Sequence, residues 1–169
     1  MAEIKTQRLK LVPMNLELLE LFLKNMEFGE AALGLEFSGE PLEQGLRETM
    51  ESLYEETQRE TQHILWYTAW VILFKNQIAG FLCLMGKPDM NSEVELGYLI
   101  RTAYRGKGYM TEALGALCQF VLGNSGIRSI RARTDSVNHA SIKVLEKCGF
   151  EKVIEDGNEK IWRLKYIDQ

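Results

Sequence analysis

The sequence predicts one α/β (α+β) domain with a mixed, mostly antiparallel sheet of six to seven strands and about four helices. Two observations lead to this fold class. Residues 66–74 and 78–85 are rich in aromatic and β-branched side chains and are joined by a short polar turn, which is typical of an antiparallel hairpin. Between residues 93 and 134 a strand, a helix and a strand follow one another, and such a crossover joins parallel strands. With 169 residues and no linker or internal repeat, the chain suits a single domain over residues 1–169.

The N-terminal part predicts one strand and two helices. Apolar and charged residues alternate up to Pro13, as in a short strand. Asn15 is a favourable N-cap for the first helix, and Pro41 suits the first position of the second. The expected elements are a strand over 8–13, a helix over 16–26, a loop or broken helix over 27–40 and a helix over 41–54.

The remaining chain predicts most of the sheet and two further helices. Asn138 is the expected N-cap of the second of these helices, because helical spacing starts directly after it. The expected elements are strands over 66–74, 78–85, 93–100, 127–134, 150–154 and 160–166, and helices over 111–122 and 138–148.

Composition argues against several classes of protein. The net charge is −4 and no basic block stands out, which disfavours broad nucleic-acid binding. No apolar run approaches the roughly 20 residues that span a bilayer, and no signal-peptide pattern opens the chain, so we expect a cytoplasmic protein without a membrane partner. Cys83, Cys118 and Cys148 are widely spaced among apolar neighbours, which favours buried, reduced thiols over a disulfide or a metal site.

The segment from Tyr104 to Leu114 is the most informative about chemistry. It leads from a predicted strand into a predicted helix, and Gly106 and Gly108 let backbone N–H groups converge on an anion without a side chain in the way. The helix N-terminus and two basic residues add positive charge. The segment therefore predicts a cradle for a phosphate or diphosphate. It is neither a P-loop, which needs Ser or Thr after the lysine, nor the dinucleotide fingerprint, which needs a third glycine at Thr111.

In these residues the chain resembles the Gcn5-related N-acetyltransferases (GNAT). Their signature Arg/Gln-x-x-Gly-x-Gly/Ala is present as Arg105-Gly-Lys-Gly-Tyr-Met110, with Met110 in place of the small residue. The likeness is closer to the RimJ/RimL-like branch, the ribosomal-protein N-terminal acetyltransferases, and spans nearly the whole chain. The matching segments are 6–11, 95–100, 106–114 and 138–150.

The resemblance implies a GNAT fold with a central splayed pair of parallel strands and acetyl-CoA as the cofactor. The pantetheine arm is expected to pair with the strand backbone in the gap, with Gly97 at a bulge that begins the splay. The diphosphate is expected on the N–H groups from Arg105 to Thr111. The residues that the resemblance assigns to coenzyme A are Tyr98, Leu99, Ile100, Arg105, Gly106, Lys107, Gly108, Tyr109, Met110, Thr111, Asn138 and Ser141.

Catalysis requires a neutral amine to attack a thioester, so a general base or a water relay must remove a proton. Glu93 and Glu95 point to one face of their strand, and we expect Glu95 to be the base if that face lines the acceptor cleft; otherwise both are a polar strand edge. Many superfamily members place a tyrosine acid where this chain has Leu145. Ser141 is then the nearest hydroxyl, either as the acid or bonded to the helix backbone.

These features predict an acetyl-CoA-dependent N-acetyltransferase that acts by direct attack in a ternary complex. The acceptor is a primary amine, either a protein N-terminus or a small molecule. No cysteine stands beside a histidine base, which disfavours an acyl-enzyme. The alternative is a non-catalytic CoA-binding module of the same fold. The chain is expected to be a monomer or a homodimer.

Overall fold

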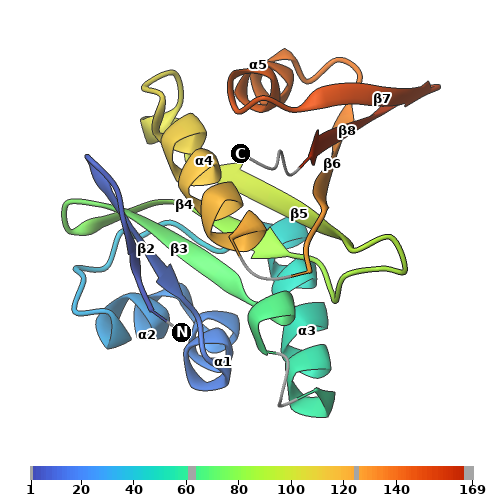
Figure 1. Cartoon of the computed structure of the whole chain (residues 1–169). Coiled ribbons are helices and arrows are strands. Elements are labelled where there is room, and N and C mark those ends of the chain that lie inside the picture. The colour runs from blue at the N-terminus through green and yellow to red at the C-terminus, as the bar shows by residue number, and fades with distance from the viewer. Residues whose placement is uncertain (1, 61–63, 124–125, 166–169) are drawn as a thin grey trace.

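A computed structural model describes residues 2–60, 64–123 and 126–165 (Figure 1). A single sheet has eight strands in the order β1-β2-β3-β4-β5-β6-β8-β7. Within the described residues β5 and β6 are the parallel neighbours, and the other neighbours are antiparallel. The strands are β1 (Ile4–Lys5), β2 (Leu9–Pro13), β3 (Ala69–Phe74), β4 (Gln77–Leu84), β5 (Glu93–Ile100), β6 (Ser129–Asp135), β7 (Glu151–Asp156) and β8 (Glu159–Lys165).

Within the described residues, five α-helices and two 3-10 turns accompany the sheet. The helices are α1 (Leu16–Lys24), α2 (Met26–Ala32), α3 (Gln44–Arg59), α4 (Tyr109–Leu122) and α5 (His139–Lys147), and the 3-10 turns are η1 (Ile64–Tyr67) and η2 (Thr102–Tyr104). The mixed fold class, the parallel pair and the N-caps at Asn15 and Asn138 are confirmed. The described end of the last strand is Lys165, and the expected strand residue Tyr166 lies outside the described residues.

Several sequence-based boundaries were wrong. The sheet has eight strands rather than six or seven, because the short β1 pairs with β2. A fifth helix, α2, covers the first six residues of the segment 27–40, which was expected to be a loop or a broken helix, and the expected single helix over 16–26 ends earlier. Asn25 is extended and ends α1, and its side chain then accepts a hydrogen bond from the Glu27 N–H to cap α2. Pro41 does not begin α3, which starts at Gln44, because Leu42 is buried in the core from the segment that precedes the helix.

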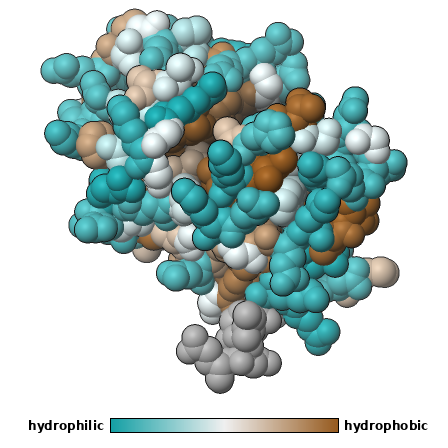
Figure 2. Space-filling model, turned by 90° about the horizontal axis from the view of Figure 1, so that it is seen from above, coloured by the Kyte–Doolittle hydropathy of each residue, from teal (hydrophilic) through white to brown (hydrophobic). Residues whose placement is uncertain are grey.

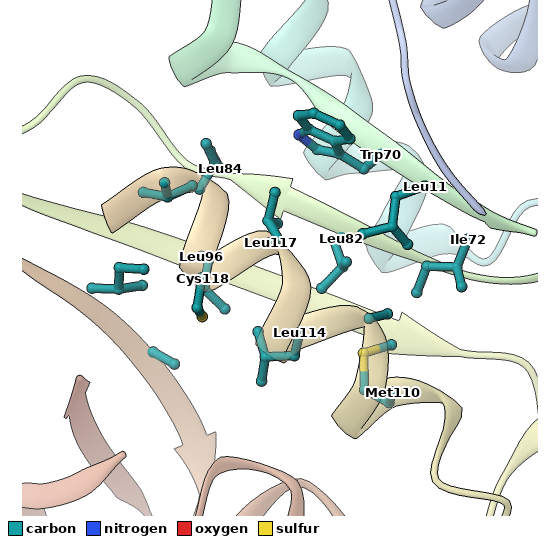
Figure 3. Close-up of a cluster of buried hydrophobic side chains, with 14 of the residues drawn as sticks. Leu11, Trp70, Ile72, Leu82, Leu84, Leu96, Met110, Leu114, Leu117 and Cys118 are labelled. Carbon is teal, nitrogen blue, oxygen red and sulfur yellow. The ribbon is translucent and has the colours of Figure 1, made fainter. Parts of the chain in front are cut away.

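The sheet is covered on both faces by helices (Figure 1). Helix α4 packs on one face, where Leu114 and Leu117 meet Leu82 and Leu96 from the strands (Figure 3). Helices α1, α2 and α3 cover the other face of β3 and β4, through side chains such as Phe22, whose ring stands edge-on to the ring of Phe81. Because strand side chains alternate, even-numbered residues of β5 face α4 and odd-numbered residues face α3.

The parallel pairing of β5 and β6 is short. Their register runs from Glu93 opposite Ser129 to Leu96 opposite Ala132, and the last four residues of β5, 97–100, pair with β4 alone. The predicted splay is therefore present and starts after Leu96. The predicted bulge at Gly97 is wrong, because the register of β4 and β5 runs through this residue without a shift.

The outer surface is mainly hydrophilic in the view of Figure 2, where hydrophobic side chains form separate patches rather than a continuous band. No helix in the described part of the chain is long and apolar enough to cross a membrane.

Gly80 allows β4 to approach β5 closely. A Cβ at this position would lie 2.3 Å from the carbonyl oxygen of Leu99. We predict that Gly80→Ala destabilises the protein by about 2 kcal/mol, because β5 must move away, and lowers Tm by roughly 4–8 °C. Thermal unfolding would measure the change. Gly115→Ala on α4 is the matched control, since nothing lies within 4 Å of the added Cβ and Tm should stay equal or rise. Equal Tm values for the two variants would contradict the role of Gly80.

Candidate active site

The turn between β5 and α4 has the backbone of an anion site. Gly106 and Gly108 have φ angles of 73° and 78°, in the left-handed region that favours glycine. Gly108 is the N-cap of α4 and offers no side-chain cap, and the first bond within the helix runs from the Glu112 N–H to the Gly108 carbonyl. The N–H groups of Tyr109, Met110 and Thr111 therefore have no acceptor within the helix.

The basic side chains of this turn fold back on the backbone that precedes it. Arg105 Nε donates to the carbonyl of Ile100 at 3.3 Å, and Lys107 Nζ donates to the carbonyl of Ala103 at 2.8 Å. Both side chains are exposed, so they add positive charge around the turn without filling it.

Met110 stands where the family signature has a small residue, and its side chain points away from the turn. It is 4% exposed and lies in the core between α4 and the sheet (Figure 3). Because the Met110 side chain is buried in the core, it does not cover the exposed backbone of the turn.

Arg8 and Glu112 form a brace behind the turn. The Glu112 carboxylate accepts from Thr6 Oγ1 at 2.6 Å, from the Arg8 backbone N–H at 2.8 Å and from Arg8 Nε at 2.6 Å. Arg8 Nη1 donates to the Lys107 carbonyl at 3.0 Å, and the guanidinium lies 4.7 Å from the centre of the Tyr109 ring. Since a trans peptide points its C=O and N–H in opposite directions, anchoring the Lys107 carbonyl turns the Gly108 N–H to the other side.

Burial raises the pKa of Glu112, but hydrogen bonds from Thr6 and Arg8 and the charge of Arg8 outweigh it, so that the pKa lies below its ordinary value of 4.5. Because the folded-state pKa is lowered, the brace stabilises the protein fully above the unfolded pKa. Its contribution is lost as pH falls through the lowered folded value.

We predict that Glu112→Gln lowers the free energy of unfolding at pH 7 by about 1–2 kcal/mol, because hydrogen bonds to a charged group are replaced by weaker ones. The difference from the parent protein should shrink as pH falls below about 4.5. Thermal unfolding between pH 7 and pH 3 measures both effects. Glu146→Gln, an exposed change on α5, should leave the profile unchanged. A difference that stays constant down to pH 3 would contradict the assignment.

The splayed end of β5 offers backbone groups to a ligand. The carbonyl of Glu95 accepts from Met85, and the N–H of Arg101 donates to Ala79, so odd-numbered residues of β5 direct their backbone toward β4. By the alternation of a strand, Tyr98 and Ile100 direct theirs toward the gap beside β6. Of the three residues expected to pair with the pantetheine arm, Leu99 has its backbone turned toward β4.

Helix α5 lies beside the gap and is joined to β5. The Asn138 side chain caps it by accepting from the Ser141 N–H at 3.1 Å. The Ser141 carbonyl accepts from the Tyr98 hydroxyl at 3.1 Å, and burial raises the pKa of this hydroxyl to about 12, so that it stays protonated. No hydrogen bond joins Ser141 Oγ to another group of the described chain, so its hydroxyl is available to a ligand. Leu145 is fully buried.

Glu93 and Glu95 share a face, as expected, but have different surroundings. Glu93 is buried and accepts from Ser129 Oγ at 2.8 Å and from Arg163 Nε. Burial raises its pKa, and the hydrogen bonds from Arg163 and Ser129 outweigh this effect and lower it. Glu93 is therefore a structural anion of the sheet.

Glu95 is partly exposed and has one guanidinium on each carboxylate oxygen. Its Oε2 accepts from Arg131 Nη2 at 2.8 Å, and its Oε1 lies 3.0 Å from Arg133 Nε. It lines a cavity of about 320 Å³ between the N-terminal half of α3 and the face of β4 and β5 opposite α4. A cavity therefore lies on the face of β5 that carries Glu95.

Three residues around the candidate site were not identified from the sequence. Arg8 is about a hundred residues from Lys107, Arg133 reaches Glu95 from β6, and Glu43 lines the cavity from the start of α3. Only Glu43 had a local signal, as an acidic residue just before a predicted apolar helix face.

Comparisons with known proteins agree with this geometry. A family model described as acetyltransferase (GNAT) domain matches residues 8–151. A curated relative from Bacillus subtilis (strain 168), described as the uncharacterized N-acetyltransferase YjdG, is 29% identical over 164 residues, which cover 96% of this chain and 97% of the relative.

Solved structures share the fold along almost the full chain. RimL, a ribosomal L7/L12 alpha-N-protein acetyltransferase in complex with coenzyme A, has a TM-score of 0.68 and 19% identity, covering 97% of this chain and 98% of its own. A ribosomal-protein-S5-alanine acetyltransferase from Vibrio fischeri has a TM-score of 0.69 and 16% identity, covering 98% and 97%. At these identities the likeness bears on the fold.

Proposed function

The chain belongs to the acetyltransferase (GNAT) family, and from this membership we propose that it transfers an acetyl group to a primary amine by direct attack in a ternary complex. The donor of this family is acetyl-CoA, which supplies the acetyl group as an activated thioester. The observation that carries the proposal is the uncapped N-terminus of α4, placed behind two left-handed glycines and beside the open edge of β5.

The residues of the turn fit the diphosphate of coenzyme A. Their free N–H groups follow one another at the start of a helix, where the partial positive charge favours an anion. We assign the diphosphate to the N–H groups from Gly106 to Thr111, because the Arg105 N–H already donates to the Thr102 carbonyl at 3.2 Å. We assign the pantetheine arm to the backbone of Tyr98 and to the N–H of Ile100, whose carbonyl accepts from Arg105. Asn138 and Ser141 border the same gap from α5 and are proposed as further contacts.

We propose that Glu95 accepts the proton of the acceptor amine through water, because a protonated amine has no lone pair for attack. Arg131 and Arg133 hold this carboxylate in one orientation by charge-assisted hydrogen bonds. Ser141 Oγ, free of protein partners within the described residues, is proposed to donate a proton to the departing thiolate.

The cysteines favour direct attack over a covalent acyl-enzyme. Burial raises the pKa of Cys83 to about 12 and that of Cys148 to about 11, and it also raises the pKa of Cys118. A thiol is a nucleophile as its thiolate, and these thiols stay protonated near neutral pH. Direct attack is therefore favoured over an acyl-enzyme, and the family match supports a transferase over a non-catalytic CoA-binding module.

We predict that Gly108→Val weakens acetyl-CoA binding at least about tenfold. A β-branched residue is strained at a φ of 78°, and its Cβ would lie 3.4 Å from Arg8 Nη2, so the turn that orients the backbone donors is displaced. Isothermal titration calorimetry measures the affinity. Gly157→Val in the turn between β7 and β8 is the matched control: its φ is also positive, at 57°, so it imposes comparable strain far from the turn before α4. Both variants should lose stability, and only Gly108→Val should lose affinity. An unchanged affinity would remove the anion site from the proposal.

For proton transfer, we predict that Glu95→Gln lowers kcat at least about tenfold at pH 7, with a smaller loss at high pH where more of the amine is neutral. Glu159→Gln is the control, because Glu159 also pairs with Arg133 but does not line the cavity.

Ser141→Ala should lower kcat while the calorimetric affinity for acetyl-CoA changes little. Steady-state kinetics with thiol detection checks these outcomes, and parent-like turnover of Glu95→Gln at every pH would exclude Glu95 as the base.

A further inference from the structure

The cavity between α3 and the sheet is mostly apolar. Its volume of about 320 Å³ lies at the small end of ligand pockets. The apolar side chains that line it are Leu46 from α3, Phe81, Cys83 and Met85 from β4 and its end, and Leu99 from β5. Cys83 belongs with them chemically, because its thiol stays protonated.

Most polar side chains around the cavity already have protein partners. Thr49 Oγ1 donates to the Gly45 carbonyl at 2.9 Å. Arg133 lies within 3.0 Å of Glu95 and within 3.4 Å of Glu159, so its charge is balanced on two sides. A ligand that enters the cavity gains few hydrogen bonds or ion pairs from these side chains, because they already have protein partners.

Glu43 differs from the other polar lining residues. It is exposed at the N-cap position of α3, where its side chain makes no capping hydrogen bond. Within residues 2–60, 64–123 and 126–165, no hydrogen bond or ion pair engages its carboxylate. Glu43 therefore places a negative charge, unpaired within these residues, at the border of a mostly apolar cavity.

We propose that the acceptor is a primary amine with an apolar body and a single positive charge, and that Glu43 receives its ammonium group. The proposal rests on the function proposed above and specifies its acceptor. The apolar body takes the place of water against Leu46, Phe81 and Leu99, which is favourable in proportion to the area buried. Glu43 acts in recognition, and the proton then leaves by way of Glu95.

The same chemistry disfavours the other classes of amine acceptor. A polyamine or an aminoglycoside has several charges or hydroxyls, which would lose water against apolar walls without gaining partners. An acceptor with an acidic first residue would place a second carboxylate beside Glu43, and like charges repel. Two sources fit the favoured chemistry: a peptide N-terminus with an apolar first residue, and a small apolar amine.

The test is an acceptor panel with acetyl-CoA and thiol detection. It comprises leucinamide, aspartic acid amide, lysinamide, spermidine and a peptide that begins with leucine. Leucinamide or the leucine peptide should exceed aspartic acid amide and spermidine at least about tenfold in kcat/KM. The better of the two leucine acceptors identifies the source. A preference for spermidine or for aspartic acid amide, or equal values across the panel, would overturn the proposal.

Variants of Glu43 separate recognition from proton transfer. Glu43→Gln should raise the KM for leucinamide roughly three- to fivefold with little change in kcat, because an exposed ion pair of modest strength is lost. Glu43→Lys should raise it further, and 0.5 M salt should reduce both effects. Glu48→Gln is the matched control on the same helix, since Glu48 bonds Gln44 and does not line the cavity. A KM unchanged by Glu43→Lys would exclude Glu43 from recognition.

The proposed function and its acceptor class fail in different ways. Turnover of leucinamide no faster than of spermidine, with normal acetyl-CoA binding, overturns the acceptor class and leaves the function intact. If no acceptor releases CoA, the function fails, and calorimetry of leucinamide with the CoA-bound protein decides the rest: binding that Glu43→Gln weakens supports the assignment of the cavity, and absence of binding overturns it.

Discussion

The site depends on the way in which β5 leaves β6. At the start of β5, buried Glu93 accepts from Ser129 on β6 and from Arg163 on β8, so one carboxylate ties three neighbouring strands together. Breaking such a buried pair is costly, since it leaves an uncompensated charge. The parallel pairing ends at Leu96. Beyond it the backbone of Tyr98 faces the gap without a partner strand, and the Ile100 carbonyl on the same side accepts from Arg105. The strands are thus fixed at one end and parted at the other.

The same strand leads directly into the turn proposed to bind the diphosphate. After Ile100 the chain passes through the short turn η2 to the two left-handed glycines and α4, so the open edge and the free N–H groups are consecutive in the chain. Sequence-distant residues then fix their orientation. Arg8, directly before β2, anchors the Lys107 carbonyl, and Glu112 holds Arg8 in place. The backbone donors are therefore oriented before a ligand arrives, which reduces the entropic cost of binding.

The two faces of β5 have different proposed roles. Even-numbered residues face α4 and α5, where Tyr98 contacts Ser141, and this side borders the gap proposed for coenzyme A. Odd-numbered residues face α3, where Glu95 and Leu99 line the cavity proposed for the acceptor. The side chains of β5 alternate between its two faces, so the strand contributes to both proposed binding sites. The acetyl donor and the acceptor would therefore lie next to each other on either side of this strand. Proximity of this kind contributes strongly to a bimolecular transfer.

Features that depend on neighbouring residues could be predicted from the sequence. The caps at Asn15 and Asn138, the order of the main strands and the glycine turn before α4 follow from local preferences and spacing, and the family resemblance was confirmed over residues 8–151. The short strand β1 and helix α2 were missed, because two residues carry too little pattern for a strand and Asn25 both ends one helix and caps the next.

Contacts between side chains that are distant in the sequence could be found only in the folded chain. The partners of Glu95, the brace between Arg8 and Glu112 and the free carboxylate of Glu43 depend on strand register and helix placement. The glycine turn before α4 could be predicted from the sequence, because a glycine backbone before a helix creates its N–H donors locally. The cavity proposed for the acceptor could not, because its lining residues on α3 and β5 are about fifty residues apart in the chain and form one wall only when the sheet is complete.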